Sequence, residues 1–249
     1  MGKETDMNIL KSEKLKIKNS GMFLSSIVIA VLCGAFALFF GGTFNILHQS
    51  IYWWMGVFLM ALLQIIAYRN LSIEKKANDF FNLKTSTQNT GKIYISKIAW
   101  TLYYGFLGTV IMSFIIMFFK WSMPHNGIIS SNLSIVLGLS VIYLANIWIV
   151  PIFFLISKKV APIILILLNF LLSFLVAPFV AGTHFFFCLP HSYAFKPAKF
   201  FFSIKEAGDI LSRPIILIDR IEMMIALALS IMLFILFSFL LYRRENKNA

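Results

Sequence analysis

Long stretches without charge are the feature that most restricts how this chain folds. Six segments of about 18–25 residues contain no Asp, Glu, Lys or Arg: 22–40, 51–68, 98–119, 133–156, 160–179 and 223–242. A helix of this length, rising about 1.5 Å per residue, crosses a hydrocarbon layer about 30 Å thick. Because the bilayer interior offers the backbone no hydrogen-bond partner, such segments must be helical. The sequence therefore predicts an all-α membrane protein, with residues 1–249 forming one domain.

Composition supports a membrane protein and argues against other classes. The chain is 59% hydrophobic and 16% aromatic, which no ordinary soluble domain of 249 residues matches. The net charge of +12 could suggest a nucleic-acid partner, but the basic residues flank the apolar segments instead of forming one face. We therefore expect the lipid bilayer, and no nucleic acid, as a partner. Cys33 and Cys188 have no metal-ligand spacing, so neither a metal site nor a disulfide is expected.

The distribution of Lys and Arg predicts the orientation. With a cytoplasmic N-terminus, most of the 22 basic residues fall in the inner segments 1–20, 69–97, 157–159 and 243–249. Positive residues stay on the cytoplasmic side during insertion. We therefore expect a multi-pass protein of the cytoplasmic membrane with both termini in the cytoplasm.

The N-terminal segment before the first apolar stretch mixes apolar residues with lysines. Met7, Leu10 and Ile17 can share one helical stripe, whereas Ile9 and Leu15 lie off it. Such a basic amphipathic segment suits a helix lying flat in the headgroup layer. The alternative is a solvated basic tail that only enforces orientation.

Two connections between the apolar segments contain unexpected aromatic residues. In the inner segment 69–97, Phe80, Phe81 and Leu83 lie among charges, which is typical of a docking surface. The alternative is that these side chains pack back on the helix ends. The outer segment 180–222 is too apolar for a free loop, so we expect partial re-entry or packing against the outer helix ends.

Motifs for enzymatic chemistry are absent from the sequence. It contains neither a GxxxxGK[ST] phosphate loop nor an HExxH zinc motif, so no catalytic residue, metal or cofactor is expected in this chain. Within the apolar segments, only Tyr and Cys are ionisable, which argues against ion-coupled transport and favours an outside energy source. Asn146 and Asn169 are the deepest polar residues, and they either join helices or line a substrate path.

Four short motifs resemble those of one transporter family. They are Leu10-Lys-Ser-Glu-Lys-Leu-Lys-Ile-Lys-Asn-Ser, Tyr52-Trp-Trp, Glu74-Lys-Lys-Ala-Asn-Asp-Phe-Phe-Asn-Leu and Leu189-Pro-His-Ser-Tyr. With them, the layout resembles type-2 ABC exporters, and more narrowly the permeases of lantibiotic self-protection transporters, the epidermin, mutacin and nisin immunity group. One departure is that Asn78 stands where many relatives have Gly, and Thr85-Ser-Thr-Gln lacks their Pro before the third span.

The resemblance implies six transmembrane helices in the type-2 exporter architecture and assigns roles to three sets of residues. An N-terminal interfacial elbow helix would contain Lys11, Glu13, Lys14, Lys16 and Lys18. A coupling helix seated in a separate ATPase would use Glu74, Lys75, Lys76, Asn78, Phe80, Phe81, Asn82 and Leu83. The candidate substrate-facing residues are Trp53, Trp54, Asn146, Asn169, Pro190, His191 and Tyr193.

The resemblance also implies an assembly and a substrate. Relatives pair two different permeases with two copies of one ATPase subunit, which binds ATP and Mg²⁺. They expel a lantibiotic peptide from the cytoplasmic membrane of a Gram-positive bacterium, which gives the producer self-immunity. The alternatives are a type-2 exporter subunit for another substrate, such as a bacitracin-like drug, a lipid or another peptide, and an immunity protein that only sequesters the lantibiotic.

Overall fold

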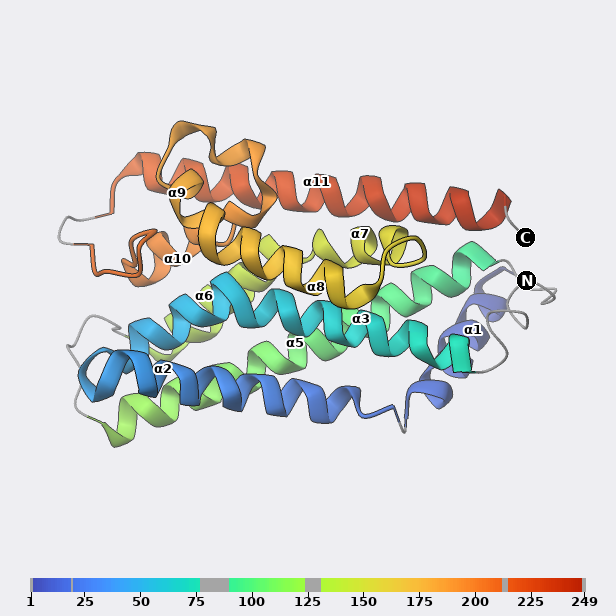
Figure 1. The fold of residues 1–249 in the computed structure, drawn as a ribbon, viewed down its shortest axis with the longest axis horizontal. Coiled ribbons are helices and arrows are strands. Elements are labelled where there is room, and N and C mark those ends of the chain that lie inside the picture. The colour runs from blue at the N-terminus through green and yellow to red at the C-terminus, as the bar shows by residue number, and fades with distance from the viewer. Residues whose placement is uncertain (1, 19, 77–89, 124–130, 212–214, 248–249) are drawn as a thin grey trace.

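The computed structural model describes residues 2–18, 20–76, 90–123, 131–211 and 215–247. Nearly all of them are helical, as the sequence predicts, and the long helices lie side by side in a bundle (Figure 1). The elements are α1 (Gly2–Ile17), α2 (Met22–Trp53), η1 (Trp54–Phe58), α3 (Leu59–Lys76), α5 (Thr90–Ser122), α6 (Asn132–Asn146), α7 (Ile149–Ile156), α8 (Pro162–Leu171), η2 (Leu172–Val176), α9 (Ala177–Ala181), η3 (His184–Cys188), η4 (Pro190–Ser192), α10 (Phe195–Phe202) and α11 (Leu217–Lys247).

Five helical stretches of the described chain are long and apolar enough to cross a membrane. They are Met22–Lys76, Thr90–Ser122, Asn132–Ile156, Pro162–Ala181 and Leu217–Lys247. The multi-pass character predicted from the sequence thus holds. The expected count of six is not confirmed, because the first two apolar segments belong to one stretch of 55 residues.

That first stretch doubles back on itself at Gly42. The Cys33 thiol donates to the Ser50 carbonyl at 3.6 Å, although 17 residues separate the two, which would be about 25 Å along a straight helix. Gly42 has φ 59° and ψ −173°, a backbone conformation that is essentially restricted to glycine. In Figure 1 the blue part of α2 accordingly runs one way along the bundle, and α3 returns beside it.

Several helices extend beyond the apolar segments that predicted them. The predicted second segment ends at residue 68, but α3 continues to Lys76, and α5 begins at Thr90 instead of residue 98. Outside the hydrocarbon layer a helix tolerates polar side chains, so the loss of hydrophobicity marks the edge of the lipid and not the end of the helix.

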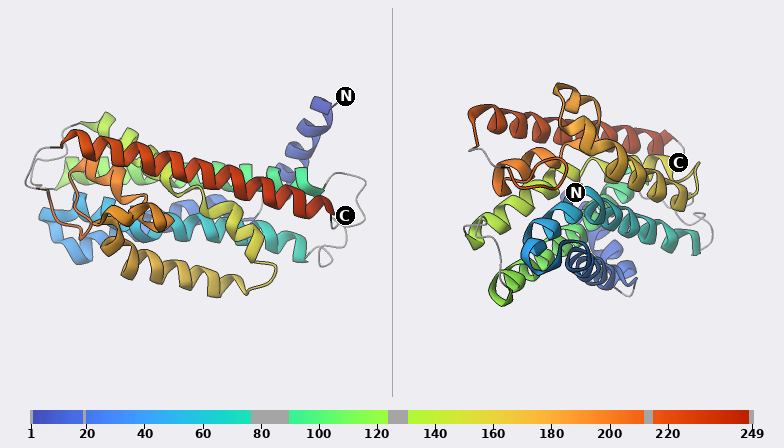
Figure 2. Two further views of the ribbon diagram at one scale, coloured as in Figure 1. Left: turned by 90° about the horizontal axis from the view of Figure 1, so that it is seen from above. Right: turned by 60° about the vertical axis from the view of Figure 1, so that its left-hand side comes forward.

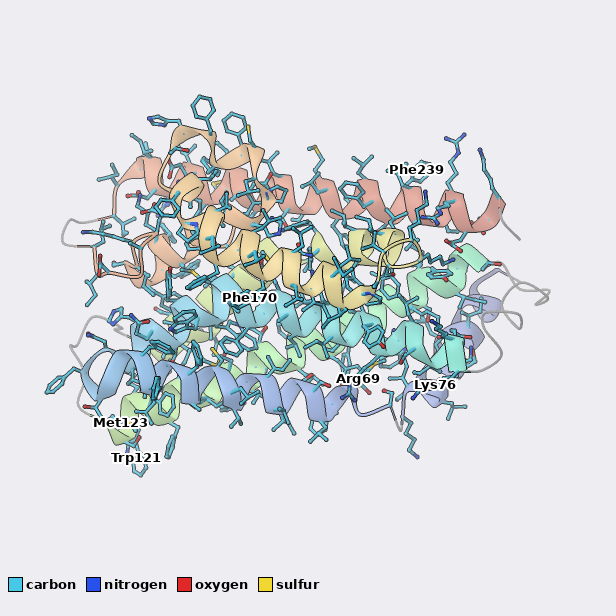
Figure 3. All side chains as sticks on the ribbon, in the orientation of Figure 1. Arg69, Lys76, Trp121, Met123, Phe170 and Phe239 are labelled. Atoms are coloured by element: carbon cyan, nitrogen blue, oxygen red, sulfur yellow. The ribbon has the colours of Figure 1, made fainter. Side chains whose placement is uncertain are left out.

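The two ends of the bundle differ in their elements. At one end, α1 packs against α5, and the C-terminal end of α11 lies at the same end of the bundle (Figures 1 and 2). The turn before α8 is also there, because the Lys158 ammonium is 2.6 Å from the Glu245 carboxylate. Figure 3 places Lys76 at this end and Trp121 and Met123 at the opposite end. We call these the α1 end and the far end.

The Phe-rich segment between α9 and α11 packs onto the bundle at the far end. Phe195 and Phe202 of α10 are buried, and Phe202 lies so close to Gly138 of α6 that a Cβ there would collide with its ring. The segment therefore packs on protein instead of forming a free loop, as the sequence predicts.

Candidate functional site

A buried cluster of four charges joins three helices at the α1 end. Lys97 of α5 contacts Glu13 of α1 at 2.6 Å and Glu74 of α3 at 2.8 Å. Lys16 of α1 contacts the same two carboxylates, at 2.8 Å from Glu13 and 3.0 Å from Glu74. We call Glu13, Lys16, Glu74 and Lys97 the ionic quartet. It is formally neutral and ties α1 to both helices that flank residues 77–89.

Three members of the quartet are removed from solvent. The side chains of Lys97, Glu13 and Glu74 are 1%, 2% and 4% exposed, whereas Lys16 is 41% exposed. Buried charges are tolerated only when they are paired and hydrogen-bonded, and removing one partner typically costs about 3–5 kcal/mol. The quartet therefore resists separation of α1 from the bundle.

Hydrogen bonds around the quartet fix the backbone of Lys97. Its carbonyl accepts from the Asn70 amide at 3.0 Å and from the Thr101 hydroxyl at 2.8 Å. Burial disfavours the charged form of Lys16, but its hydrogen bonds to Glu13 and Glu74 outweigh this, and the pKa of Lys16 lies above its ordinary value. The Lys16 ammonium is therefore charged at neutral pH.

The face that α1 buries differs from the stripe expected from the sequence. Ile9, Glu13 and Ile17, spaced by four, face the bundle, and Leu10 is 40% exposed. The sequence groups Leu10 with Ile17 on one stripe and leaves Ile9 off it, whereas the face against the bundle contains Ile9 and Ile17 but not Leu10. Glu13 lies on this face, where its carboxylate pairs with Lys97 of α5.

The other predicted elbow residues point to solvent, and the predicted coupling residues fall into two groups. Lys11, Lys14 and Lys18 are exposed. Lys75 and Lys76 are exposed in the last turn of α3, but the buried Glu74 carboxylate faces α1 and α5. The coupling role expected for Glu74 stays a prediction. The remaining coupling residues, Asn78, Phe80, Phe81, Asn82 and Leu83, lie outside the described residues.

Two of the predicted substrate-facing residues contact each other. His191 Nε2 of η4 and Asn169 Oδ1 of α8 are 2.8 Å apart. The His191 ring also packs edge-on against Trp148, with centroids 5.0 Å apart. Burial lowers the pKa of His191 to about 4, so the ring is neutral at pH 7 and donates to the Asn169 oxygen. His191 is buried, whereas Asn169 is half-buried on the surface of α8.

The remaining predicted substrate-facing residues are dispersed. Trp54 and Asn146 are fully buried, and the Asn146 amide donates to Ile142 of its own helix at 3.0 Å. The Tyr193 hydroxyl, also buried, donates to the Phe187 carbonyl at 2.8 Å, while Pro190 is half-buried. These four therefore do not form one surface.

Trp53 belongs to a continuous row of aromatic rings. It stacks on Phe174 of η2 at 5.6 Å and packs edge-on against Phe36 of α2 at 4.9 Å. Phe40 and Phe170 extend the row at either end, at 5.6 Å from Trp53 and 5.9 Å from Phe174. We call Phe36, Phe40, Trp53, Phe170 and Phe174 the aromatic row. All four phenylalanines are exposed on the outside of the bundle.

Lys97 is the functional residue that the sequence did not reveal. Its position just before the third apolar segment is typical of a headgroup lysine, and nothing local indicates two carboxylate partners 23 and 84 residues away.

Among the described residues, no group of three or more His, Cys, Asp or Glu side chains could hold a metal ion.

Comparisons with known proteins do not identify a relative. No family model, no curated protein and no solved structure matches the chain.

Proposed function

We propose that this chain is the membrane-spanning permease subunit of an ABC transporter, with ATP hydrolysis in a separate subunit. In this proposal Met22–Lys76 crosses the membrane twice around Gly42, which gives six crossings and the type-2 exporter arrangement. The α1 end faces the cytoplasm with both termini. The observation that best supports this proposal is the ionic quartet, because it joins α1 to the two helices that lead into and out of residues 77–89.

The quartet provides a route for mechanical coupling. A partner that binds residues 77–89 acts on the end of α3 and the start of α5. Since Lys97 holds both Glu13 and Glu74, α1, α3 and α5 move together as a rigid unit. Motion of the partner during ATP binding and hydrolysis would then be passed to the spans.

The aromatic row supports a membrane-embedded amphipathic substrate. A lantibiotic peptide is already inserted in the lipid, so its path does not need a polar pore. Exposed rings at the lipid-facing surface can bind its apolar face, and aromatic rings also attract its cationic groups. We therefore propose export of a lantibiotic, with immunity as the result. Export of a bacitracin-like drug, a lipid or another peptide is the second candidate.

A resistance assay tests the transport proposal. The gene is deleted in its native host, and inhibitory concentrations are measured for a panel of lantibiotics and for bacitracin. We expect hypersensitivity to at least one lantibiotic, restored by the wild-type chain but not by Lys97→Met. The matched control is Lys120→Met at the far end, where the lysine donates to Asn132 Oδ1 at 3.3 Å; it should restore resistance.

Three other results would contradict parts of this proposal. Unchanged resistance to every lantibiotic, together with hypersensitivity to bacitracin, would select the second candidate. Protection that persists when the proposed ATPase subunit is inactivated by substitution would indicate sequestration of the peptide instead of transport. ATP hydrolysis by the purified chain alone would refute the proposal that hydrolysis takes place in a separate subunit.

A further inference from the structure

An apolar groove runs between three helices at the α1 end. Its walls include Ile9 and Leu10 of α1, Ile95 and Ala99 of α5, and Tyr242 of α11, and its volume is about 350 Å³. This size lies at the lower end of the range of ligand pockets. We call it the α1 groove. It is separate from the aromatic row and from the His191 site, both of which belong to other elements.

Two polar side chains interrupt the apolar lining of the groove. Lys92 lies one turn before Ser96 on α5, and both line it. Ser96 is buried, and its hydroxyl has no hydrogen-bond partner within the described part of the chain. A buried hydroxyl without a partner is costly, so a ligand oxygen at this position would be stabilising.

Basic residues surround the groove on two of its three helices. Lys11 and Lys14 are exposed on α1, next to Leu10. On α5, Lys92 belongs to the lining itself. Apolar walls with a positive surround match a molecule that has a hydrocarbon chain and a negative head.

We propose that the α1 groove binds an anionic phospholipid, with an acyl chain against Ile95 and Ala99 and the phosphate near Lys92 and Ser96. The cytoplasmic leaflet carries the anionic lipids that attract basic segments beside membrane helices. Placing the groove in that leaflet rests on the proposed orientation. The lipid would bridge α1, α5 and α11, and so would hold α1 in the position that the ionic quartet requires.

Native mass spectrometry of the detergent-purified full chain tests this proposal. The protein is titrated with phosphatidylglycerol and with phosphatidylcholine of the same acyl chains. We expect one phosphatidylglycerol to bind in preference to phosphatidylcholine. Ala99→Phe, which fills the groove, should abolish the preference. The matched control is Ala35→Phe, at an exposed position of α2 away from the groove, which should keep it.

A charge variant gives a second measure. Lys92→Gln should weaken phosphatidylglycerol binding about fivefold, as expected for one basic residue near a membrane surface. Lys205→Gln, which removes a lysine of the far-end segment, should leave binding unchanged. A photoreactive phosphatidylglycerol should cross-link to peptides containing residues 92–99 in the wild-type chain, which makes the test independent of variant folding.

The results that would overturn the lipid-binding proposal differ from those that would overturn the transport proposal. Equal binding of the two lipids would refute anionic selectivity. Binding that survives Ala99→Phe, or cross-links only outside the three helices of the groove, would place the lipid elsewhere. A chain that dimerises through this face in detergent and binds no lipid would show that a second copy occupies the groove. None of these measurements depends on transport or on an ATPase.

Discussion

Lys97 is the residue on which the α1 end depends most. A lysine with its side chain 1% exposed is stable only because two carboxylates lie within 3 Å of its ammonium. The sequence predicted that Glu13, Lys16 and Glu74 matter, but as residues facing lipid or a partner. It could not predict their convergence, because ion pairing across 58 or 84 residues leaves no local pattern.

Replacing Lys97 with Met should be strongly destabilising. The substitution keeps the side-chain volume but leaves Glu13 and Glu74 buried with only the half-exposed Lys16 as a partner. We expect a loss of about 3–5 kcal/mol, measured as the fall in thermal stability of the detergent-solubilised protein. The triple variant Glu13→Gln, Glu74→Gln, Lys97→Met should recover part of the loss. Equal stability of Lys97→Met and wild type would contradict the burial of the quartet.

His191 should make stability depend on pH. Burial lowers its pKa to about 4 in the folded state from an ordinary value of 6.5, so between these values the unfolded chain binds one proton more than the folded chain. This contribution to stability is complete above pH 6.5 and is lost as the pH falls toward 4. It amounts to about 3 kcal/mol. Thermal unfolding between pH 4 and 7.5 measures it.

The control for His191 keeps the hydrogen bond and removes the titration. In His191→Gln, the side-chain amide can still donate to Asn169, so the dependence on pH should flatten. His184→Gln, at an exposed position of the same segment, should retain the wild-type dependence. Identical pH profiles for His191→Gln and wild type would show that another group titrates.

At the scale of elements, apolar length predicted which segments are helical, and other forces set their ends and turns. The helices extend into polar sequence at Arg69–Lys76 and at Thr90–Lys97, because hydrogen bonding in the backbone continues outside the lipid. The π-helical turns η1 and η2 have no signal in the sequence. The reversal at Gly42 was expected somewhere between the first two apolar segments, but two adjacent glycines, Gly41 and Gly42, left its position open.

Gly42→Ala should destabilise the hairpin. A Cβ at φ 59° and ψ −173° is strained although no other atom lies near it, so the cost comes from the backbone alone. We expect about 1–3 kcal/mol, seen as a lower unfolding temperature. Gly182→Ala is the matched control, because its φ is −74° and a Cβ there meets only ordinary contacts. An equal effect of both substitutions would argue against a reversal at Gly42.

At the scale of the whole molecule, the proposed topology is tested by finding on which side of the membrane each end of the bundle lies. Cys188 is exposed at the far end, whereas Cys33 is buried, so the wild-type chain has one accessible thiol. In intact cells a membrane-impermeant maleimide should label Cys188. In a Cys188→Ser background, Lys76→Cys and Lys247→Cys should be labelled only after the membrane is permeabilised. Labelling of Lys76→Cys in intact cells would rule out the proposed orientation.

The separation of the quartet along the chain has a consequence for biogenesis. Glu13 leaves the ribosome 84 residues before Lys97, so the nascent first helix carries a carboxylate whose buried partner has not yet been translated. Burying that carboxylate alone would be unfavourable. The first helix therefore cannot dock stably until the segment with Lys97 is in place, and its docking is a late step that completes the α1 end.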